Sequence, residues 1–237
     1  MNGQRLQKFL SDSAELVSVV GHGSLMSIES AARSFKRIEA FRTCTVPGFA
    51  RVFNKVCIHS IRSGAVDQGA REIACCSATP LPGHVLHAAA FDLHREEVPS
   101  LLEREHEFEV VPVEISEAGP HTTNTKTALL CVETTDEVYR TTKCSSESEY
   151  HRRVGQFYEG KIWRDDIRPA RAYLQLCLTA ARDLGQGVYE NLLDASFLAD
   201  RKTTVREYLN SQPDVLSWVT SPARYSASRG GHDGQEG

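Results

Sequence analysis

Residues 16–26 read LVSVVGHGSLM, and the fold prediction rests on this stretch. Its β-branched apolar run predicts a buried strand over 16–21, which ends abruptly at Gly21-His22-Gly23-Ser24. Two glycines within three residues let backbone N–H groups approach a ligand closely. Successive N–H groups on such a loop form a concave site for an anion or an oxyanion. The stretch therefore predicts a strand that delivers a ligand-binding loop, with a tight structural turn as the alternative.

A second informative stretch is LLEREHEF at 101–108, where glutamates alternate with other residues. If the segment is extended, these carboxylates share one solvated face. Glu105 is the best candidate for an inward-facing base, because it follows a short helix that begins at Pro99 and precedes an apolar strand near Phe108. Apolar neighbours would raise its pKa, as a general base requires.

Several familiar site types do not fit. Met26 occupies the third glycine position of a dinucleotide-binding G-x-G-x-x-G motif, and the P-loop lysine and the G-x-S-x-G motif of serine hydrolases are missing. His84 and His87 lie three apart in a predicted strand, so they point to opposite faces and do not form a metal pair.

Composition indicates an ordinary soluble globular chain of 237 residues, with 41% hydrophobic and 24% charged residues. This length favours one domain with appendages. The net charge of −4 provides no basic footprint for nucleic acid. No apolar run approaches 18 residues, and the first residues lack the pattern of a secretory signal, so we expect no membrane span and a cytoplasmic location.

The seven cysteines are scattered and include the adjacent Cys75 and Cys76 but no C-x-x-C pair. This arrangement suits neither a disulfide framework nor a zinc site, and it indicates free thiols in a reducing compartment. A reactive thiol at Cys75 or Cys76 remains an open alternative.

The order of predicted elements indicates an α+β domain rather than a doubly wound sheet, because strands come first and helices last. Residues 1–15 predict a helical lead-in, and Ser27 is expected to cap a short helix up to Phe35. From Tyr150 the apolar spacing becomes helical, a helix is expected to start at Pro169 and end at Gly185, and Asp200 is expected to cap the last helix. Residues 221–237 are polar and predicted to be disordered. The other predicted strands cover 41–47, 50–61, 70–79, 85–93, 110–115 and 127–134, and residues 140–149 are predicted to be a polar connector.

Four segments resemble the gamma-glutamylcyclotransferase family, including its ChaC branch. VVGHGSLM is similar to the family's YGSL-type glycine loop, and VPGFARVFN resembles the strand-turn-strand that follows it. HREEVPSLLEREHEFEVVPVEI resembles the helix, catalytic glutamate and next strand of the family. A late segment, from YLQLCLTAARD to TTVREYL, is similar to a C-terminal extension found in some members, so the resemblance covers roughly residues 16–210.

The resemblance implies a small mixed β-barrel or strongly curved sheet flanked by helices, with a helical extension over about 150–210. It implies that a substrate's own α-amine attacks its gamma-carbonyl and releases 5-oxoproline. Glu105 matches the catalytic glutamate, and the family needs no metal or cofactor, only a small-molecule gamma-glutamyl substrate. The residues that match the substrate-holding loop are Gly21, His22, Gly23, Ser24 and Leu25.

Three residues depart from the family pattern: His22 and Phe108 stand where tyrosine is usual, and His106 where glycine is frequent. These departures motivate an alternative, a non-catalytic gamma-glutamyl ligand-binding or interaction protein with the same fold. Within the cyclotransferase interpretation the substrate stays open between glutathione, gamma-glutamyl amino acids and gamma-glutamyl amines. The sequence predicts no oligomeric state.

Overall fold

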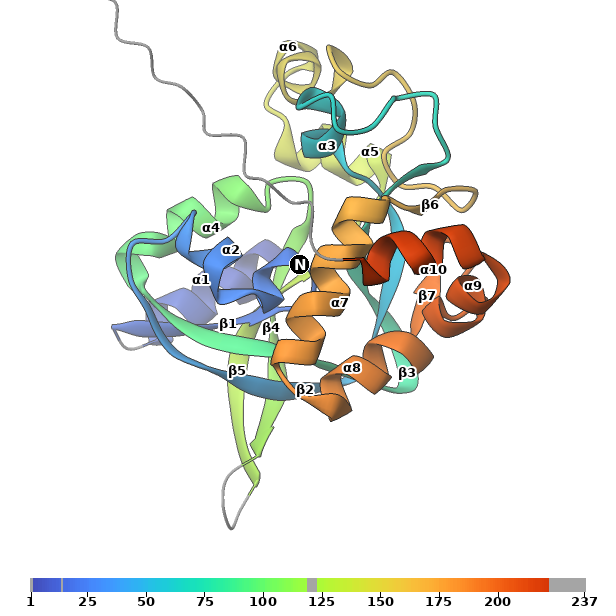
Figure 1. The fold of residues 1–237 in the computed structure, drawn as a ribbon. Helices are drawn as coiled ribbons and strands as arrows, with labels where there is room; N and C mark the ends of the chain where they lie inside the picture. The colour runs from blue at the N-terminus through green and yellow to red at the C-terminus, as the bar shows by residue number, and fades with distance from the viewer. Residues whose placement is uncertain (1, 14, 119–122, 222–237) are drawn as a thin grey trace, which may run out of the picture.

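The computed structural model describes residues 2–13, 15–118 and 123–221, and within them a seven-stranded sheet forms the centre of the molecule (Figure 1). The strand order is β6-β3-β1-β5-β4-β2-β7, and β3 also pairs with β5 and β2. These additional pairings close β1, β5, β4, β2 and β3 into a small mixed barrel, as the resemblance predicted. The strands are β1 (Leu16–Gly21), β2 (Ile38–Val56), β3 (Glu72–His94), β4 (Glu109–Ala118), β5 (Thr123–Val132), β6 (Arg168–Pro169) and β7 (Ser196–Leu198).

Strand β1 has the bounds predicted from its apolar run, and it lies between β3 (antiparallel) and β5 (parallel). Successive side chains of a strand face opposite sides of the sheet. Val19 therefore packs with the helices on one side, while Val20 joins a cluster made of strand residues inside the barrel. Because both faces of β1 are buried, the loop that follows it has a fixed place in the fold.

The four separate strands predicted over residues 41–93 are two long ones, which corrects the prediction. β2 and β3 pair along most of their length, with register shifts near Pro47 and Val52. Gly48 and Gly83 interrupt the apolar pattern, but their positive φ angles of 77° and 85° bend the strands instead of ending them. The predicted strand 50–61 also ends early, because the helix α3 (Ile58–Arg62) follows β2.

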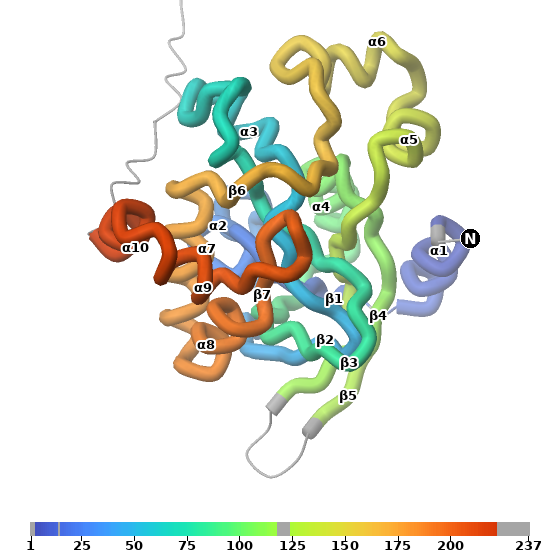
Figure 2. The backbone as a smooth tube through the Cα atoms, turned by 90° about the vertical axis from the view of Figure 1, so that its right-hand side faces the viewer, coloured from blue at the N-terminus to red at the C-terminus, as the bar shows by residue number. Residues whose placement is uncertain are grey.

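Strands β4 and β5 form the predicted hairpin, and they are longer than expected. The far ends of β4 and β5 project from the body of the molecule in both views (Figures 1 and 2). At the opposite end, the short helices α3, α5 (Asp136–Val138) and α6 (Glu147–Tyr150) gather above the barrel (Figure 2).

Three further helices pack against the barrel: α1 (Asn2–Asp12), which contacts β4, α2 (Ile28–Ala32), which contacts the turn after β1, and α4 (Val98–Arg104). Ser27 caps α2 through a bond from the Ser30 N–H, as predicted, although the helix ends before Phe35. Pro99 lies in the first turn of α4. Leu101, fully buried, fixes α4 against β1 and β3.

Between residues 139 and 155 the backbone forms two π-helical turns, Tyr139–Lys143 and His151–Gly155, around α6. The helical period predicted from Tyr150 therefore persists only to Gly155, and residues 140–149 are largely helical rather than a polar connector. Tyr139, Tyr150 and Val154 are buried, so this segment is packed against the barrel.

The C-terminal helices form a layer on the other side of the sheet (Figures 1 and 2). They are α7 (Arg171–Asp183), α8 (Gln186–Asp194), α9 (Val205–Ser211) and α10 (Pro213–Thr220). The starts of two of these helices, α7 and α9, differ from the prediction. Pro169 belongs to the short strand β6, and Thr204 rather than Asp200 caps α9, through a reciprocal capping box with Glu207.

No helix in the described ranges is long and apolar enough to cross a membrane. Of the tail predicted to be disordered, 222–237 lie outside the described residues.

Candidate active site

Glu105 is held in place by the end of helix α4. Its N–H donates to the Leu101 carbonyl at 2.9 Å, and its own carbonyl accepts from the Phe108 N–H at 2.9 Å, so the chain turns at this residue. The side chain is only 15% exposed. Burial raises the pKa of its carboxyl and Glu107 adds to the rise, while Arg104 opposes it. A shielded carboxyl whose pKa is raised is suited to accept and return a proton.

Arg104 connects this carboxyl with the glycine loop. Its Nε lies 2.9 Å from Glu105 Oε1, and another guanidinium nitrogen donates to Ser24 Oγ at 3.1 Å. A third contact reaches the Ser34 hydroxyl beyond α2. Because guanidinium donors are planar and rigid, these bonds fix the loop relative to Glu105. The two predicted parts of the site, about 80 residues apart in sequence, are thus brought together.

The loop itself is a short 3₁₀ turn, Ser24–Met26, directly after β1. Met26 N–H donates to the Gly23 carbonyl, which closes the turn. In the part of the chain described, the N–H groups of Ser24 and Leu25 donate to no protein acceptor, as is usual in a first turn. Two adjacent N–H groups without a protein acceptor can bind an anionic group of a ligand.

Both loop positions require glycine, because neighbouring atoms occupy the space that a Cβ would need. A Cβ on Gly21 would lie 2.2 Å from the Leu25 carbonyl oxygen, so no side chain fits there. A Cβ on Gly23 would lie 2.2 Å from the Tyr173 hydroxyl and 3.0 Å from Cys76 Sγ. The C-terminal helix α7 thus reaches the loop through Tyr173.

His22 faces inward with its ring edge-on to Phe108, at 6.5 Å between ring centroids. It is 6% exposed, and its Nδ1 has no hydrogen-bond partner among the described residues. Burial, together with the positive charge of Arg51, lowers the pKa of His22 to about 3. His22 is therefore neutral at physiological pH, with one buried polar atom free for a ligand.

A fully buried arginine, Arg51, lies beneath the loop. Its Nε donates to the His22 carbonyl at 2.5 Å, and its other nitrogens donate to the His87 carbonyl at 3.0 Å and to Ser196 Oγ at 2.8 Å. These acceptors lie on the loop, β3 and β7, so one side chain fixes three segments. The charge also adds positive potential below the loop's free N–H groups.

Beside Glu105 lies a second ion pair, Lys55 and Glu107. Lys55 Nζ is 3.2 Å from Glu107 Oε2 and 5.1 Å from the centre of the Phe108 ring. The Lys55 side chain is only 4% exposed and that of Glu107 22%. Lys55 lowers and Glu107 raises the pKa of the Glu105 carboxyl, so the two members of the pair act on this carboxyl in opposite directions.

Solved structures provide the comparison that decides the fold. One described as a gamma-glutamyl cyclotransferase superposes with a TM-score of 0.50 and 11% identity, over 74% of this chain and 84% of that one. The chain has the gamma-glutamyl cyclotransferase fold. A structure of an uncharacterized protein from Homo sapiens has a TM-score of 0.49 at 13% identity, over 73% of this chain and 82% of that one. No protein-family model and no curated protein sequence matches.

In this gamma-glutamyl cyclotransferase fold, four residues that hold the site together were not predicted from the sequence. They are Arg51, Lys55, Arg104 and Tyr173. Arg51 left a signal, since it is the one charged residue in the largely apolar segment FARVFN. Arg104 and Tyr173 left none, because their partners are distant in sequence.

The glutamates that alternate in sequence do not share one face. Glu103 belongs to α4, is 65% exposed and pairs with Arg153, whereas Glu105 and Glu107 are largely shielded. The expected solvated face is therefore wrong for this segment, because the helix ends within it.

The thiols of Cys75 and Cys76 are 7% and 2% exposed. Cys76 Sγ lies 3.3 Å from the Tyr173 hydroxyl and 3.8 Å from the His22 carbonyl, behind the loop. A thiol reaction on a substrate has little room at either position.

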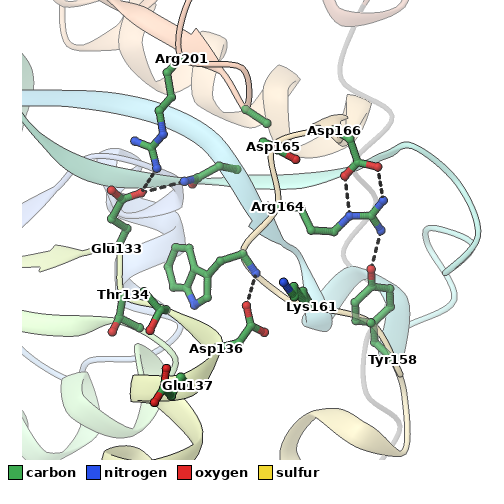
Figure 3. Close-up of a pocket in the computed structure, with 15 residues that line it drawn as sticks. Glu133, Thr134, Asp136, Glu137, Tyr158, Lys161, Arg164, Asp165, Asp166 and Arg201 are labelled. Atoms are coloured by element: carbon green, nitrogen blue, oxygen red, sulfur yellow. Dashed lines mark hydrogen bonds and ion pairs between the residues drawn. The ribbon is translucent and has the colours of Figure 1, made fainter.

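A groove of about 990 Å³ opens beside β5, and neither Glu105 nor a loop residue lines it (Figure 3). Its charges are largely satisfied within the protein. Glu133 accepts from Asn54 and Arg201, each at 2.8 Å, and Arg164 binds Asp166 and the Tyr158 hydroxyl. The residues that line this groove therefore form a network of structural contacts next to the site. Among the described residues, no group of three or more metal-binding side chains occurs.

Proposed function

We propose that this chain is a cyclotransferase that cleaves gamma-glutamyl compounds and releases 5-oxoproline. The observation that carries the proposal is the position of Glu105, a shielded carboxyl held through Arg104 beside a loop with free N–H groups. The fold shared with a gamma-glutamyl cyclotransferase structure agrees with this activity.

In the proposed reaction, Glu105 takes a proton from the substrate's α-ammonium group. The freed amine attacks the gamma-carbonyl carbon, and a five-membered ring closes with a negative charge on the carbonyl oxygen. As the carbon–nitrogen bond to the leaving group breaks, Glu105 returns the first proton to the departing amine, which also receives the second proton of the ring nitrogen and leaves as an ammonium. Well-oriented ring closures reach effective molarities of about 10⁵ M or more, so positioning supplies much of the rate.

The loop residues Gly21, His22, Gly23, Ser24 and Leu25 would hold the gamma-glutamyl group. The N–H groups of Ser24 and Leu25 are suited to bind either the substrate's α-carboxylate or the developing oxyanion. Arg51 would favour both, since its charge lies below the same loop. The free Nδ1 of His22 offers a polar contact in place of the family's tyrosine hydroxyl.

A panel of substrates tests the proposal. We expect 5-oxoproline release from at least one of glutathione, gamma-glutamyl dipeptides and gamma-glutamyl amines, and the panel identifies the leaving group. We expect this activity to belong to the cytoplasm and, if glutathione is the substrate, to glutathione metabolism.

The same panel separates catalysis from binding. Calorimetric binding of a gamma-glutamyl compound without release of 5-oxoproline, from weakly acidic to alkaline pH, would support the ligand-binding alternative that the departures at His22 and Phe108 motivate. Release of 5-oxoproline would exclude that alternative.

A further inference from the structure

Arg104 and Glu105 place a positive and a negative group side by side at the end of helix α4. Arg104 Nε lies 2.9 Å from Glu105 Oε1, and both side chains are partly open to solvent, Arg104 at 26% and Glu105 at 15%. Two opposite charges in contact are complementary to a ligand whose own two opposite charges are also adjacent. An α-amino acid head, with its carboxylate and its ammonium on one carbon, is such a ligand.

The two side chains keep hydrogen-bonding capacity for a ligand of this kind. A guanidinium has five N–H donors. Arg104 uses one on Glu105, one on the Ser24 hydroxyl and one on the Ser34 hydroxyl, which leaves one N–H on each terminal nitrogen without an acceptor among the described residues. Glu105 Oε2 accepts no hydrogen bond from the part of the chain that the structure describes. The pair can therefore bind a carboxylate and an ammonium without giving up its present contacts.

The other cations near the site are already committed. Lys55 Nζ lies 3.2 Å from Glu107 Oε2, and the Lys55 side chain is only 4% exposed. Arg51 is fully buried below the loop and donates to three protein acceptors. Among these three cations, Arg104 is therefore the one that a ligand can reach.

We propose that Arg104 binds the α-carboxylate of the substrate while Glu105 binds its α-ammonium group. This inference rests on the proposed function, and it limits the substrates to gamma-glutamyl compounds whose α-carboxylate and α-amine are both unmodified. With the carboxylate on Arg104, the N–H groups of Ser24 and Leu25 remain for the negative charge that develops on the gamma-carbonyl oxygen. The Ser24 hydroxyl, which accepts from Arg104, joins the two parts of the site.

Sulfones test this assignment without any reaction. In L-methionine sulfone, a sulfur with two oxygens replaces the gamma-carbonyl carbon, so no ring can close. Two counterparts each lack one group: 3-(methylsulfonyl)propylamine lacks the α-carboxylate, and 4-(methylsulfonyl)butanoate lacks the α-amine. We expect calorimetry on the full-length protein to show at least about tenfold tighter binding of L-methionine sulfone than of either counterpart, because each counterpart loses charge-assisted hydrogen bonds.

Variants assign the two preferences to the two side chains. Arg104→Gln should abolish the preference over the amine without a carboxylate and keep the preference over the acid without an amine, and Arg104→Lys should restore part of the first. Glu105→Gln should have the converse effect. Arg153→Gln, which removes an arginine that pairs with the exposed Glu103, is the matched control and should change neither ratio. An Arg104 that only supports the loop would, when replaced, weaken the binding of all three compounds alike.

Two results would overturn the assignment: L-methionine sulfone that binds no more tightly than its counterparts, or a preference that Arg104→Gln leaves unchanged. Both are separate from the proposed function, because release of 5-oxoproline is measured on gamma-glutamyl compounds and not on sulfones. Release without an Arg104-dependent preference would contradict this inference alone. The preference without release would support this inference and contradict the cyclotransferase proposal.

Discussion

Glu105 is the residue whose chemistry is set most directly by its neighbours. Its carboxyl is shielded by the turn at the end of α4, and two opposite charges, those of Arg104 and Glu107, act on it. The pKa of a shielded carboxyl rises because its charged form loses hydration. For a general base, the rate therefore falls as pH drops through this raised value.

Replacing Glu107 tests this balance. In Glu107→Gln, a negative charge that raises the pKa of Glu105 is gone, and Lys55 loses its carboxylate partner and acts on Glu105 alone. Both changes favour the ionised form of Glu105. On the proposed function, we expect the acidic limb of the pH–rate profile to move to lower pH by about half a unit or more. Glu114→Gln, an exposed change on β4, should leave the profile in place, and an upward shift in Glu107→Gln would show that Glu105 is not the titrating base.

At the scale of elements, the loop after β1 depends on helix α7, which lies about 150 residues later in the chain. The contact is the Tyr173 hydroxyl, which occupies the space that a side chain on Gly23 would need. Overpacking of this kind costs roughly 1–3 kcal/mol.

We expect Gly23→Ala to lower the free energy of unfolding by about that amount and to disturb the loop. Adding Tyr173→Phe removes the tightest clash, so the double variant should recover part of the loss, as measured by urea unfolding. Gly187→Ala is the control, because a Cβ there meets open space. Strictly additive losses in the double variant would mean that Tyr173 does not constrain the loop.

The elements also show what the sequence can predict. The bounds of β1, the cap at Ser27 and the helix before Glu105 follow from local patterns, and all are present. The continuity of β2 and β3 does not follow from local patterns, because Gly48 and Gly83 resemble turn residues unless the partner strand is known. The candidate site divides in the same way. Glu105 and the glycine loop were predicted from sequence, whereas the arginines that position them depend on contacts distant in sequence.

At the scale of the whole molecule, the C-terminal helices share a continuous core with the barrel. Phe53 and Ile73 of the sheet, both fully buried, lie in one cluster with Leu174 of α7 and Leu192 of α8. We propose on this basis that residues 16–210 fold as a single domain, of which about 150–210 form the helical extension.

The buried histidine predicts how the stability of this domain depends on pH. The pKa of His22 is about 3 in the folded protein and near 6.5 when unfolded, so between these values only the unfolded state binds the proton. The contribution of neutral His22 to the free energy of unfolding is therefore complete above pH 6.5 and is lost as the pH falls below that value. We expect a loss of about 2 kcal/mol in the free energy of unfolding between pH 7 and pH 5 from this residue.

Comparison of the unmutated protein with His22→Gln isolates this effect, because the other titrating groups are common to both. Urea unfolding at the two pH values should show a smaller loss in His22→Gln than in the unmutated protein, whereas the exposed His151→Gln should keep the full loss. Equal losses in all three proteins would contradict a buried, neutral His22.

The central claim is that Glu105 performs proton transfer beside the glycine loop, and one comparison tests it most directly. The substrate that releases 5-oxoproline fastest is given to the unmutated protein, to Glu105→Gln and to Glu103→Gln, the last an exposed glutamate two residues away on α4. We predict full release by the unmutated protein and by Glu103→Gln, and a loss of at least about 10²-fold in Glu105→Gln with an unchanged thermal transition. Release by Glu105→Gln close to that of the unmutated protein would contradict the account.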